Sequence, residues 1–300
     1  MKKEKRSLLF SLSAVFLWST VATAFKLTLR GISPEQLLFW ASFTSAAALA
    51  LFAYKEDKNA FVEQFSLKLL PKNFLFGALN PFLYYFVLFK AYDLLPAQEA
   101  QPLNYTWPVA VSIFSVLFLG EKFDAKKFIG LLISFSGIVV IATRGNFSEL
   151  RFENPLGTFL ALASAVVWAT FWTLKLKDKR KNSVKLFASF FYGSIISLVW
   201  LLITGKFLIP SARYLLGAAY IGLFEMGVTF FLWMKGLSLS SDKTKTSTLA
   251  YLSPFISLLF IDLILGEEIR ASSIAGLALI ISGILLQNIR KRTELRRSSE

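Results

Sequence analysis

The sequence contains no cysteine and no histidine. Without cysteine the chain can form no disulfide and offers no thiolate nucleophile, and without both residues the usual zinc ligands are missing. A Ser-His-Asp triad and a proton relay through histidine are excluded for the same reason. Any function must therefore rest on other side chains, and we expect no bound metal.

Charged residues are also scarce. They make up 17% of the 300 residues, against roughly 25% in an average soluble chain. Hydrophobic residues make up 55%, 31 residues are Phe, and the mean hydropathy is +0.57. A soluble domain cannot bury so much apolar surface, because its exterior must be covered largely by polar groups. The composition predicts an integral membrane protein that is surrounded by membrane lipid.

Ten apolar segments follow one another along the chain, each long enough to cross about 30 Å of hydrocarbon. No stretch is left over for a soluble domain. The sequence therefore predicts an all-α integral membrane protein with ten transmembrane helices, at Leu8–Leu27, Gln36–Tyr54, Phe74–Tyr92, Ala97–Leu119, Phe128–Thr143, Leu156–Leu174, Leu186–Ile203, Tyr214–Met234, Ser247–Leu265 and Ile274–Ile289.

The net charge of +14 would suit nucleic-acid binding, but the membrane explains it better. If these ten segments cross the membrane, 25 of the 33 Lys and Arg residues lie on the same side as both termini. The other 8, which include Arg151 and Lys206, lie on the opposite side. Lys and Arg collect in cytoplasmic loops, where they meet anionic lipid. We expect no nucleic-acid partner, and a multi-pass protein of the inner (plasma) membrane with both termini cytoplasmic.

The N-terminus also fits a second interpretation. Basic residues from Lys2 to Arg6, an apolar run and the small residues Ala22-Thr23-Ala24 are typical of a cleaved signal peptide. Cleavage would remove a segment that has an internal copy, so we interpret it as the first transmembrane helix.

That copy belongs to an internal repeat, which predicts two five-helix units at residues 8–143 and 156–290. Five helices is an odd number, so the second unit must cross the membrane in the opposite sense. Inverted repeats are typical of secondary transporters, which hold substrate at the repeat interface and alternate between two openings. The matched pairs are Trp18 and Trp168, Tyr105 and Tyr251, Pro108 and Pro254, Gly120 and Gly266, and Glu121 and Glu267. Pro108 and Pro254 fall inside segments four and nine, where we expect each to kink its helix.

The same residues carry a family resemblance. Pro108, Gly120-Glu121, Gly130 and Gly137, repeated as Pro254, Gly266-Glu267, Gly276 and Gly283, resemble the EamA pattern of the drug/metabolite transporter (DMT) superfamily. Leu17-Trp18-Ser19-Thr20 and Asn104-Tyr105-Thr106-Trp107-Pro108 are similar to the YddG type of bacterial exporters of aromatic and other amino acids. The resemblance implies ten helices around a central cavity, lined by segments 1, 3, 4, 6, 8 and 9. It also implies alternating access, amino acids or similar metabolites as substrates, and no cofactor.

Glu225 is the most informative single residue. It lies ten residues from Lys235 and twelve from Arg213, so it is roughly 15–18 Å from each helix end. An ionisable group so deep in the membrane is a functional candidate by default. It could bind a substrate amine or accept a coupling proton, although a purely structural carboxyl is the alternative. Glu99, by contrast, falls in the first turn of its segment, where a carboxylate favours the helix N-terminus.

Other deep side chains complete the predicted substrate site. Aromatic rings can form the apolar walls of a pocket while a few polar groups fix the orientation of a ligand, although lipid contact and core packing are the alternatives. With Glu225, the candidates are Trp18, Ser19, Asn80, Tyr84, Asn104, Tyr105, Trp107, Trp168, Thr170, Phe230, Tyr251 and Ser253.

The leading hypothesis is a secondary transporter that exports amino acids with aromatic or neutral side chains. A carrier of sugar phosphates or nucleotide sugars is an alternative, but its substrate would need Lys or Arg deep in the cavity, and every basic residue falls near a segment end. An intramembrane enzyme is the alternative from another class. The sequence offers no HExxH, no Asp-rich motif and no paired aspartates in mid-membrane.

Overall fold

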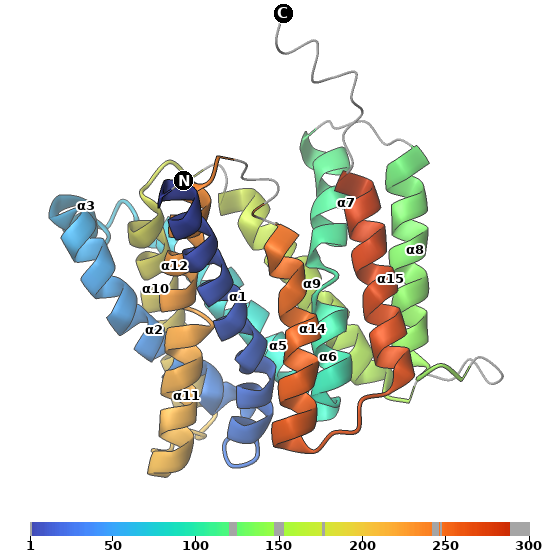
Figure 1. Cartoon of the computed structure of the whole chain (residues 1–300). Coiled ribbons are helices and arrows are strands. Elements are labelled where there is room, and N and C mark those ends of the chain that lie inside the picture. The colour runs from blue at the N-terminus through green and yellow to red at the C-terminus, as the bar shows by residue number, and fades with distance from the viewer. Residues whose placement is uncertain are drawn as a thin grey trace, which may run out of the picture.

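The computed structural model describes residues 2–119, 125–146, 153–175, 178–241, 246 and 248–288, so Gly120, Glu121 and Arg151 lie outside the described residues. Within these ranges the chain is helical and contains no strand (Figure 1). In chain order the elements are α1 (Lys2–Leu29), α2 (Pro34–Glu56), α3 (Lys58–Glu63), α4 (Leu70–Gly77), η1 (Ala78–Leu83), α5 (Tyr84–Leu94), α6 (Ala97–Asn104), α7 (Trp107–Leu119), α8 (Ala125–Ala142), α9 (Pro155–Lys175), α10 (Asn182–Ile203), α11 (Ala212–Phe224), α12 (Val228–Leu239), η2 (Thr248–Tyr251), α14 (Leu252–Phe260), η3 (Ile261–Leu265) and α15 (Ala271–Asn288).

Much of this structure is apolar enough to cross a membrane. Six helical stretches of the described residues have the necessary length and hydropathy: Lys3–Leu29, Pro34–Glu56, Leu70–Leu94, Pro155–Lys175, Asn182–Ile203 and Ala212–Leu239. Shorter apolar helices follow at Phe128–Ala142, Leu249–Leu265 and Ala271–Leu286. The predicted class, an all-α multi-pass membrane protein, is confirmed. The arrangement as ten crossings in two inverted repeats stays a prediction.

Local sequence explains where several helices begin. The Ser33 hydroxyl accepts a hydrogen bond from the Gln36 backbone N–H at 3.4 Å, and Pro34 occupies the first turn of α2, where its missing N–H is not needed. Asp57 ends α2 and caps α3, because its carboxylate accepts the Ala60 N–H at 3.0 Å. The helix α3 was not predicted, and it is too short and polar to cross the membrane.

Three long helical stretches are interrupted near their middle, and a tight turn, η2, comes directly before α14. The break between α6 and α7 lies at Tyr105 and Thr106, so Pro108 sits in the first turn of α7 rather than at the kink itself. Pro254 likewise sits in the first turn of α14, directly after the tight turn η2. A proline in a first turn removes no helical hydrogen bond, so each proline favours a new helix start just upstream.

Two interruptions were not predicted. Asn80 has extended backbone angles (φ −150°, ψ 118°) inside η1, where the chain passes from α4 to α5. Residues Glu225 to Gly227 separate α11 from α12. Proline and glycine near these positions were the available signals.

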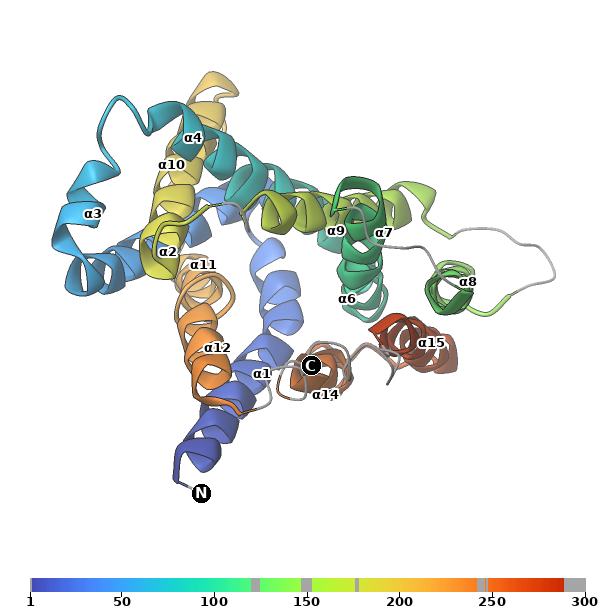
Figure 2. The ribbon, with the colours of Figure 1, turned by 90° about the horizontal axis from the view of Figure 1, so that it is seen from above.

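The helices form two end groups around a centre. Seen from above, α8 and α15 lie side by side at one end, and α2, α3 and α10 lie at the other (Figure 2). Small residues allow the α8–α15 contact. A Cβ on Gly137 would lie 2.5 Å from the Gly276 carbonyl oxygen, and one on Gly276 would lie 2.7 Å from that of Gly137. Between the end groups, α1, α5, α6, the start of α7, α9, α12 and η2 line the cavity described next.

Candidate functional site

A cavity of about 390 Å³ lies between these central helices. Its wall is mostly aromatic, with few polar groups and, among the described residues, no Lys or Arg. Nine of the predicted site residues line it: Trp18, Tyr84, Asn104, Tyr105, Trp107, Trp168, Glu225, Phe230 and Tyr251. These residues come from segments far apart in the chain, so the fold brings them together.

The other four predicted residues do not line the cavity. The Ser19 hydroxyl donates to the Val15 carbonyl at 2.7 Å, and the Thr170 hydroxyl donates to the Val166 carbonyl at 2.9 Å. Both therefore satisfy their own helix backbone, as such residues commonly do in membrane helices. Asn80 and Ser253 are buried in the protein, 2% and 0% exposed, and are not among the lining residues.

Glu225 lies where the cavity wall stops being helical. It ends α11, and its backbone N–H donates to the Ile221 carbonyl at 2.9 Å. Its carboxylate accepts a hydrogen bond from the Tyr85 hydroxyl at 3.2 Å. Tyr105 lies in the break before α7, and Tyr251 is the last residue of η2, directly before α14. Two of the three interruptions therefore coincide with the lining, and irregular backbone is tolerated at membrane depth where it lines a cavity.

A second polar side chain, that of Asn104, also lines the cavity. The Asn104 side-chain carbonyl accepts a hydrogen bond from the Tyr84 hydroxyl at 3.3 Å, and its amide donates to the Ser164 hydroxyl at 2.8 Å. These bonds fix the orientation of the Asn104 side chain. Gln101, one turn earlier on α6, is 5% exposed, and its side-chain carbonyl has no hydrogen-bond partner among the described residues.

The aromatic rings form one connected wall. Phe230 lies between the repeat-matched tryptophans, with ring centroids 5.6 Å from Trp18 and 6.0 Å from Trp168. Trp168 also lies 4.7 Å from Tyr84. Trp18 and Trp168 therefore approach the same ring from opposite helices. Tilted and edge-on rings at these distances are favourable contacts.

Sequence reasoning missed part of the lining. Trp172 and Trp233 complete the wall, and Gln101 adds the unsatisfied carbonyl. A helical period could have found them, because Trp172 follows Trp168 by four residues, Trp233 follows Phe230 by three, and Gln101 precedes Tyr105 by four.

Glu99 shows a different environment. It is 3% exposed and lies outside the cavity lining. The Arg144 guanidinium donates to it at 2.8 Å, and Arg270 forms a second ion pair with the same oxygen. Glu267 lies beside this group and accepts the backbone N–H groups of Ala97 and Gln98 at 3.1 and 3.3 Å, which caps the start of α6.

Comparison with known structures supports the fold. A protein solved by crystallography superposes with a TM-score of 0.64 at 23% sequence identity, covering 96% of this chain and 97% of that chain.

Curated proteins with similar sequences carry transporter names. The chain is 29% identical to the uncharacterized transporter YvbV of Bacillus subtilis over 72% of this chain and 71% of that protein. It is 25% identical to the aromatic amino acid exporter YddG of Ancylobacter novellus, over 95% and 97% of the two chains. The YddG exporter of Escherichia coli is likewise 25% identical, with coverage of 95% and 97%.

The family pattern matches twice. The model of the EamA-like transporter family covers residues 5–143 and 155–289, and so extends over most of the sequence. The resemblance first seen in the proline and glycine pattern is confirmed: the chain belongs to the EamA-like transporter family.

Proposed function

We propose that this protein is a secondary active transporter that exports amino acids with aromatic or neutral side chains. The observation that carries the proposal is the cavity. It combines a wall of tryptophan, tyrosine and phenylalanine with a single carboxylate, Glu225. Aromatic faces suit apolar side chains and also attract an ammonium group. The names of the two YddG relatives, exporters of aromatic amino acids, agree with this choice.

The lining favours amino acids over phosphorylated substrates. A sugar phosphate carries charge that has to be compensated in the membrane, and Lys or Arg are the groups that do so. No described lining residue is Lys or Arg. A zwitterionic amino acid needs only an anionic partner for its ammonium group and hydrogen-bond donors for its carboxylate. Glu225 supplies the first, and the hydroxyl of Tyr105 is a candidate for the second.

Glu225 is the centre of the proposed mechanism. Its one described partner is the neutral hydroxyl of Tyr85, so its charge is free to be compensated by a substrate ammonium group or by a proton. Exchange between the two would couple substrate movement to proton movement, because the cavity accommodates one compensating charge at a time. Uniport without a coupling proton is the alternative within the same mechanism.

Alternating access would follow from two inverted five-helix repeats, 8–143 and 156–290. The pattern of helix contacts supports such a two-fold relation. The helix α8 packs on α15, and α2 packs on α10; in each pair the two helices hold the same position in the two repeats. The contact between α1 and α12 is matched by the contact between α9 and α5. The division of the family match at residues 143 and 155 agrees with the same boundary. Such a relation gives two equivalent closures around one site.

We further propose that both termini face the cytoplasm of the plasma membrane. In Figure 1, α1 begins and α15 ends on the same side of the molecule, and basic residues are concentrated on that side. The chain has no native cysteine, so single cysteines report cleanly. In intact cells an impermeant maleimide should label Ser211→Cys and not Lys179→Cys. The reverse pattern would invert the topology.

Counterflow in proteoliposomes tests the function directly. Vesicles loaded with unlabelled phenylalanine should accumulate labelled phenylalanine or tryptophan when they contain the protein, and labelled glucose 6-phosphate should not enter. Empty vesicles and vesicles with the Glu225→Gln variant are the controls. Exchange of the phosphorylated sugar but of no amino acid would replace this proposal with the sugar-phosphate carrier.

A further inference from the structure

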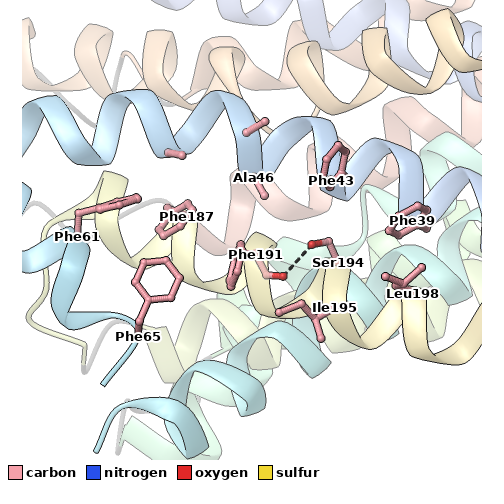
Figure 3. Close-up of a pocket in the computed structure, with 12 residues that line it drawn as sticks. Phe39, Phe43, Ala46, Phe61, Phe65, Phe187, Phe191, Ser194, Ile195 and Leu198 are labelled. Carbon is pink, nitrogen blue, oxygen red and sulfur yellow. Dashed lines mark hydrogen bonds between the residues drawn. The ribbon is translucent and has the colours of Figure 1, made fainter. Parts of the chain in front are cut away.

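A second concave site lies on the outside of the helix bundle, away from the central cavity. It is a groove of about 390 Å³ between α2 and α10, closed at one end by α3 (Figure 3). Its floor and walls are phenylalanine, alanine and other apolar side chains. The one hydroxyl among them, Ser194, donates to the Phe191 carbonyl at 2.7 Å, so it is already satisfied. The groove therefore accepts hydrocarbon and offers no polar contact along its length.

The length of the groove matches one lipid chain. On α2 the lining runs from Phe39 to Ala50, and on α10 it runs from Phe187 to Leu198. Each wall covers eleven residue steps, or about 16 Å at 1.5 Å per residue. This is about half of the 30 Å hydrocarbon core, and the lining stops five residues short of the helix ends that lie away from α3.

The closed end is aromatic and lies at the end of the transmembrane helices. Phe61 and Phe65 project from α3 and its C-terminal cap, with ring centroids 4.7 and 5.4 Å from Phe187 and Phe191 respectively. Tyr54, 46% exposed, continues the groove face of α2, and the Lys58 ammonium group lies 5.7 Å from the centre of its ring. Aromatic and basic residues at this level are typical of the headgroup region.

The loops around this end carry an excess of positive charge. Segments 55–72 and 175–185 together contain ten Lys and Arg residues and four Asp and Glu residues. Lys181 lies at the start of α10, is 49% exposed on its side chain, and pairs with Asp57 at 3.1 Å. Basic clusters on the cytoplasmic side of transmembrane helices attract anionic lipid headgroups.

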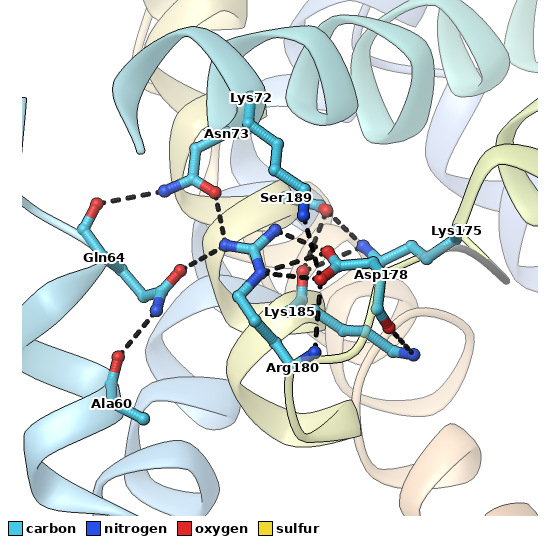
Figure 4. A network of polar contacts seen from close by, with 9 residues as sticks. All are labelled: Ala60, Gln64, Lys72, Asn73, Lys175, Asp178, Arg180, Lys185 and Ser189. Atoms are coloured by element: carbon cyan, nitrogen blue, oxygen red, sulfur yellow. Dashed lines mark hydrogen bonds and ion pairs between the residues drawn. The ribbon is translucent and has the colours of Figure 1, made fainter. Parts of the chain in front are cut away.

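A polar network holds this end in place (Figure 4). Arg180 binds Asp178 and reaches the side chains of Gln64 and Asn73, at 2.6 Å for the Asn73 oxygen. The Tyr192 hydroxyl donates to the Gln64 carbonyl at 2.8 Å. The segment that follows α3 is thus tied to α10 and to the residues just before it, which holds the closed end of the groove against α10.

From these observations we infer that the groove is a binding site for an anionic phospholipid of the cytoplasmic leaflet. One acyl chain lies between α2 and α10, and the phosphate lies near Lys58 and Lys181. This lipid site is separate from the site of the transported substrate. Only the assignment to the cytoplasmic leaflet rests on the proposed topology.

The test uses the full-length protein in nanodiscs. The probe is phosphatidylglycerol with a photoactivatable diazirine on one acyl chain, and phosphatidylcholine with the same chain is the comparison. After illumination, labelled peptides are identified by mass spectrometry. Peptides of α2 and α10 that line the groove should carry most of the label from phosphatidylglycerol, and several-fold less from phosphatidylcholine.

Two variants separate a specific site from ordinary lipid contact. Ala47→Phe fills the groove from an exposed position, and its matched control is Ala278→Phe on the exposed face of α15. Lys58→Gln with Lys181→Gln removes two rim charges, and Lys3→Gln with Lys5→Gln is the control on α1. The double lysine variant should lower groove labelling by phosphatidylglycerol about fivefold or more, because one surface lysine contributes about 1 kcal/mol to lipid binding. Ala47→Phe should lower groove labelling because its ring occupies the space of the acyl chain. Neither control should do so.

Several results would overturn the inference. Label spread evenly over all exposed helices, or equal labelling by both lipids, would mean ordinary surrounding lipid. Groove labelling unchanged in both test variants would exclude this site. Exclusion of both probes together with a cross-linked dimer through α2 or α10 would identify a second copy of the chain as the occupant. Lipid labelling is measured independently of transport. A negative labelling result therefore does not contradict the proposed transport function, and a negative transport result does not contradict the lipid site.

Discussion

Two glutamates inside the helix bundle have opposite surroundings. Glu99 lies at the start of α6 and is held by two guanidinium groups, Arg144 at 2.8 Å and Arg270. Glu225 lies in the wall of the central cavity and is held by one neutral hydroxyl, that of Tyr85 at 3.2 Å. Arginines compensate the charge of Glu99, whereas no Lys or Arg among the described residues forms an ion pair with Glu225. A carboxylate with no internal cation is the one that can exchange partners during transport.

The substitution Glu225→Gln should have the largest effect on transport. The amide has nearly the same shape but can neither titrate nor pair with an ammonium group. Losing one side of a buried charge contact costs about 2–5 kcal/mol, so counterflow of phenylalanine should fall by about 30-fold or more. Melting temperature and size-exclusion profile should stay close to wild type. Wild-type transport at equal protein content would reduce Glu225 to a structural carboxyl.

Glu99→Gln should have the converse effect. It leaves two arginines without their shared carboxylate, and breaking a buried ion pair costs about 3 kcal/mol or more where both partners are fully buried. The arginine side chains are 29% and 37% exposed, so water offsets part of this and we expect about 1–2 kcal/mol. Thermal unfolding in detergent should shift down by several degrees while transport per folded molecule is retained. The exposed Glu63→Gln should leave stability unchanged. Loss of transport without loss of stability would assign Glu99 to the substrate pathway.

The aromatic wall around Glu225 is tested by Trp168→Ala. Removing a ring that substrate covers costs about 1.5–3 kcal/mol of binding, which should weaken transport of phenylalanine and tryptophan about tenfold or more. Threonine and alanine fill less of the cavity and should be affected less. Trp200→Ala is the matched control, because Trp200 is 40% exposed on α10 and outside the cavity. Equal effects on both substrate classes would remove the preference for aromatic side chains.

Asp178 extends the comparison to the opposite end of the protein. Burial acts to raise the pKa of its carboxyl, but hydrogen bonds with Arg180 and Lys72 outweigh burial and hold the pKa well below its usual range. A carboxyl with a depressed folded-state pKa stabilises the fold above the unfolded value, near 4, and this contribution is lost as pH falls toward the folded value. Asp178→Asn should therefore cost about 1.5 kcal/mol at pH 7.

The pH dependence provides the check on Asp178. The difference in melting temperature between wild type and Asp178→Asn should be constant from pH 8 to 5 and should shrink below pH 4. Asp93→Asn is the control, since its ion pair with Lys90 is exposed on both sides. A difference between wild type and Asp178→Asn that grows as the pH falls would contradict the assigned ion pairs.

The contrast between the two glutamates was only partly predictable from sequence. The depth of Glu225 follows from its distance to both helix ends, and the pairing of Trp18 with Trp168 follows from the repeat. The partners of Glu99 could not be predicted, because Arg144 and Arg270 lie 45 and 171 residues away and meet it only after the helices pack.

The positions of the helix interruptions were also only partly predictable from the sequence. Pro108 indicated the break before α7 and Pro254 the tight turn η2, although each of these lies just upstream of its proline. The break at Glu225 has no proline beside it and carries the central carboxylate. Ser19 and Thr170 were plausible by position, but their hydroxyls bond to their own helices, and a sequence pattern does not fix which way a hydroxyl turns.

One measurement tests the contrast between the two glutamates most directly. A hydrophobic carbodiimide reacts with membrane-buried carboxyl groups, and mass spectrometry reports the modified residue in the wild-type protein. Glu225 should be modified, phenylalanine or tryptophan should protect it in a concentration-dependent way, and Glu99 should stay unmodified with or without substrate. Modification of both glutamates to the same extent, or modification of Glu225 that no amino acid reduces, would contradict the assignment of Glu225 as the substrate-facing carboxylate.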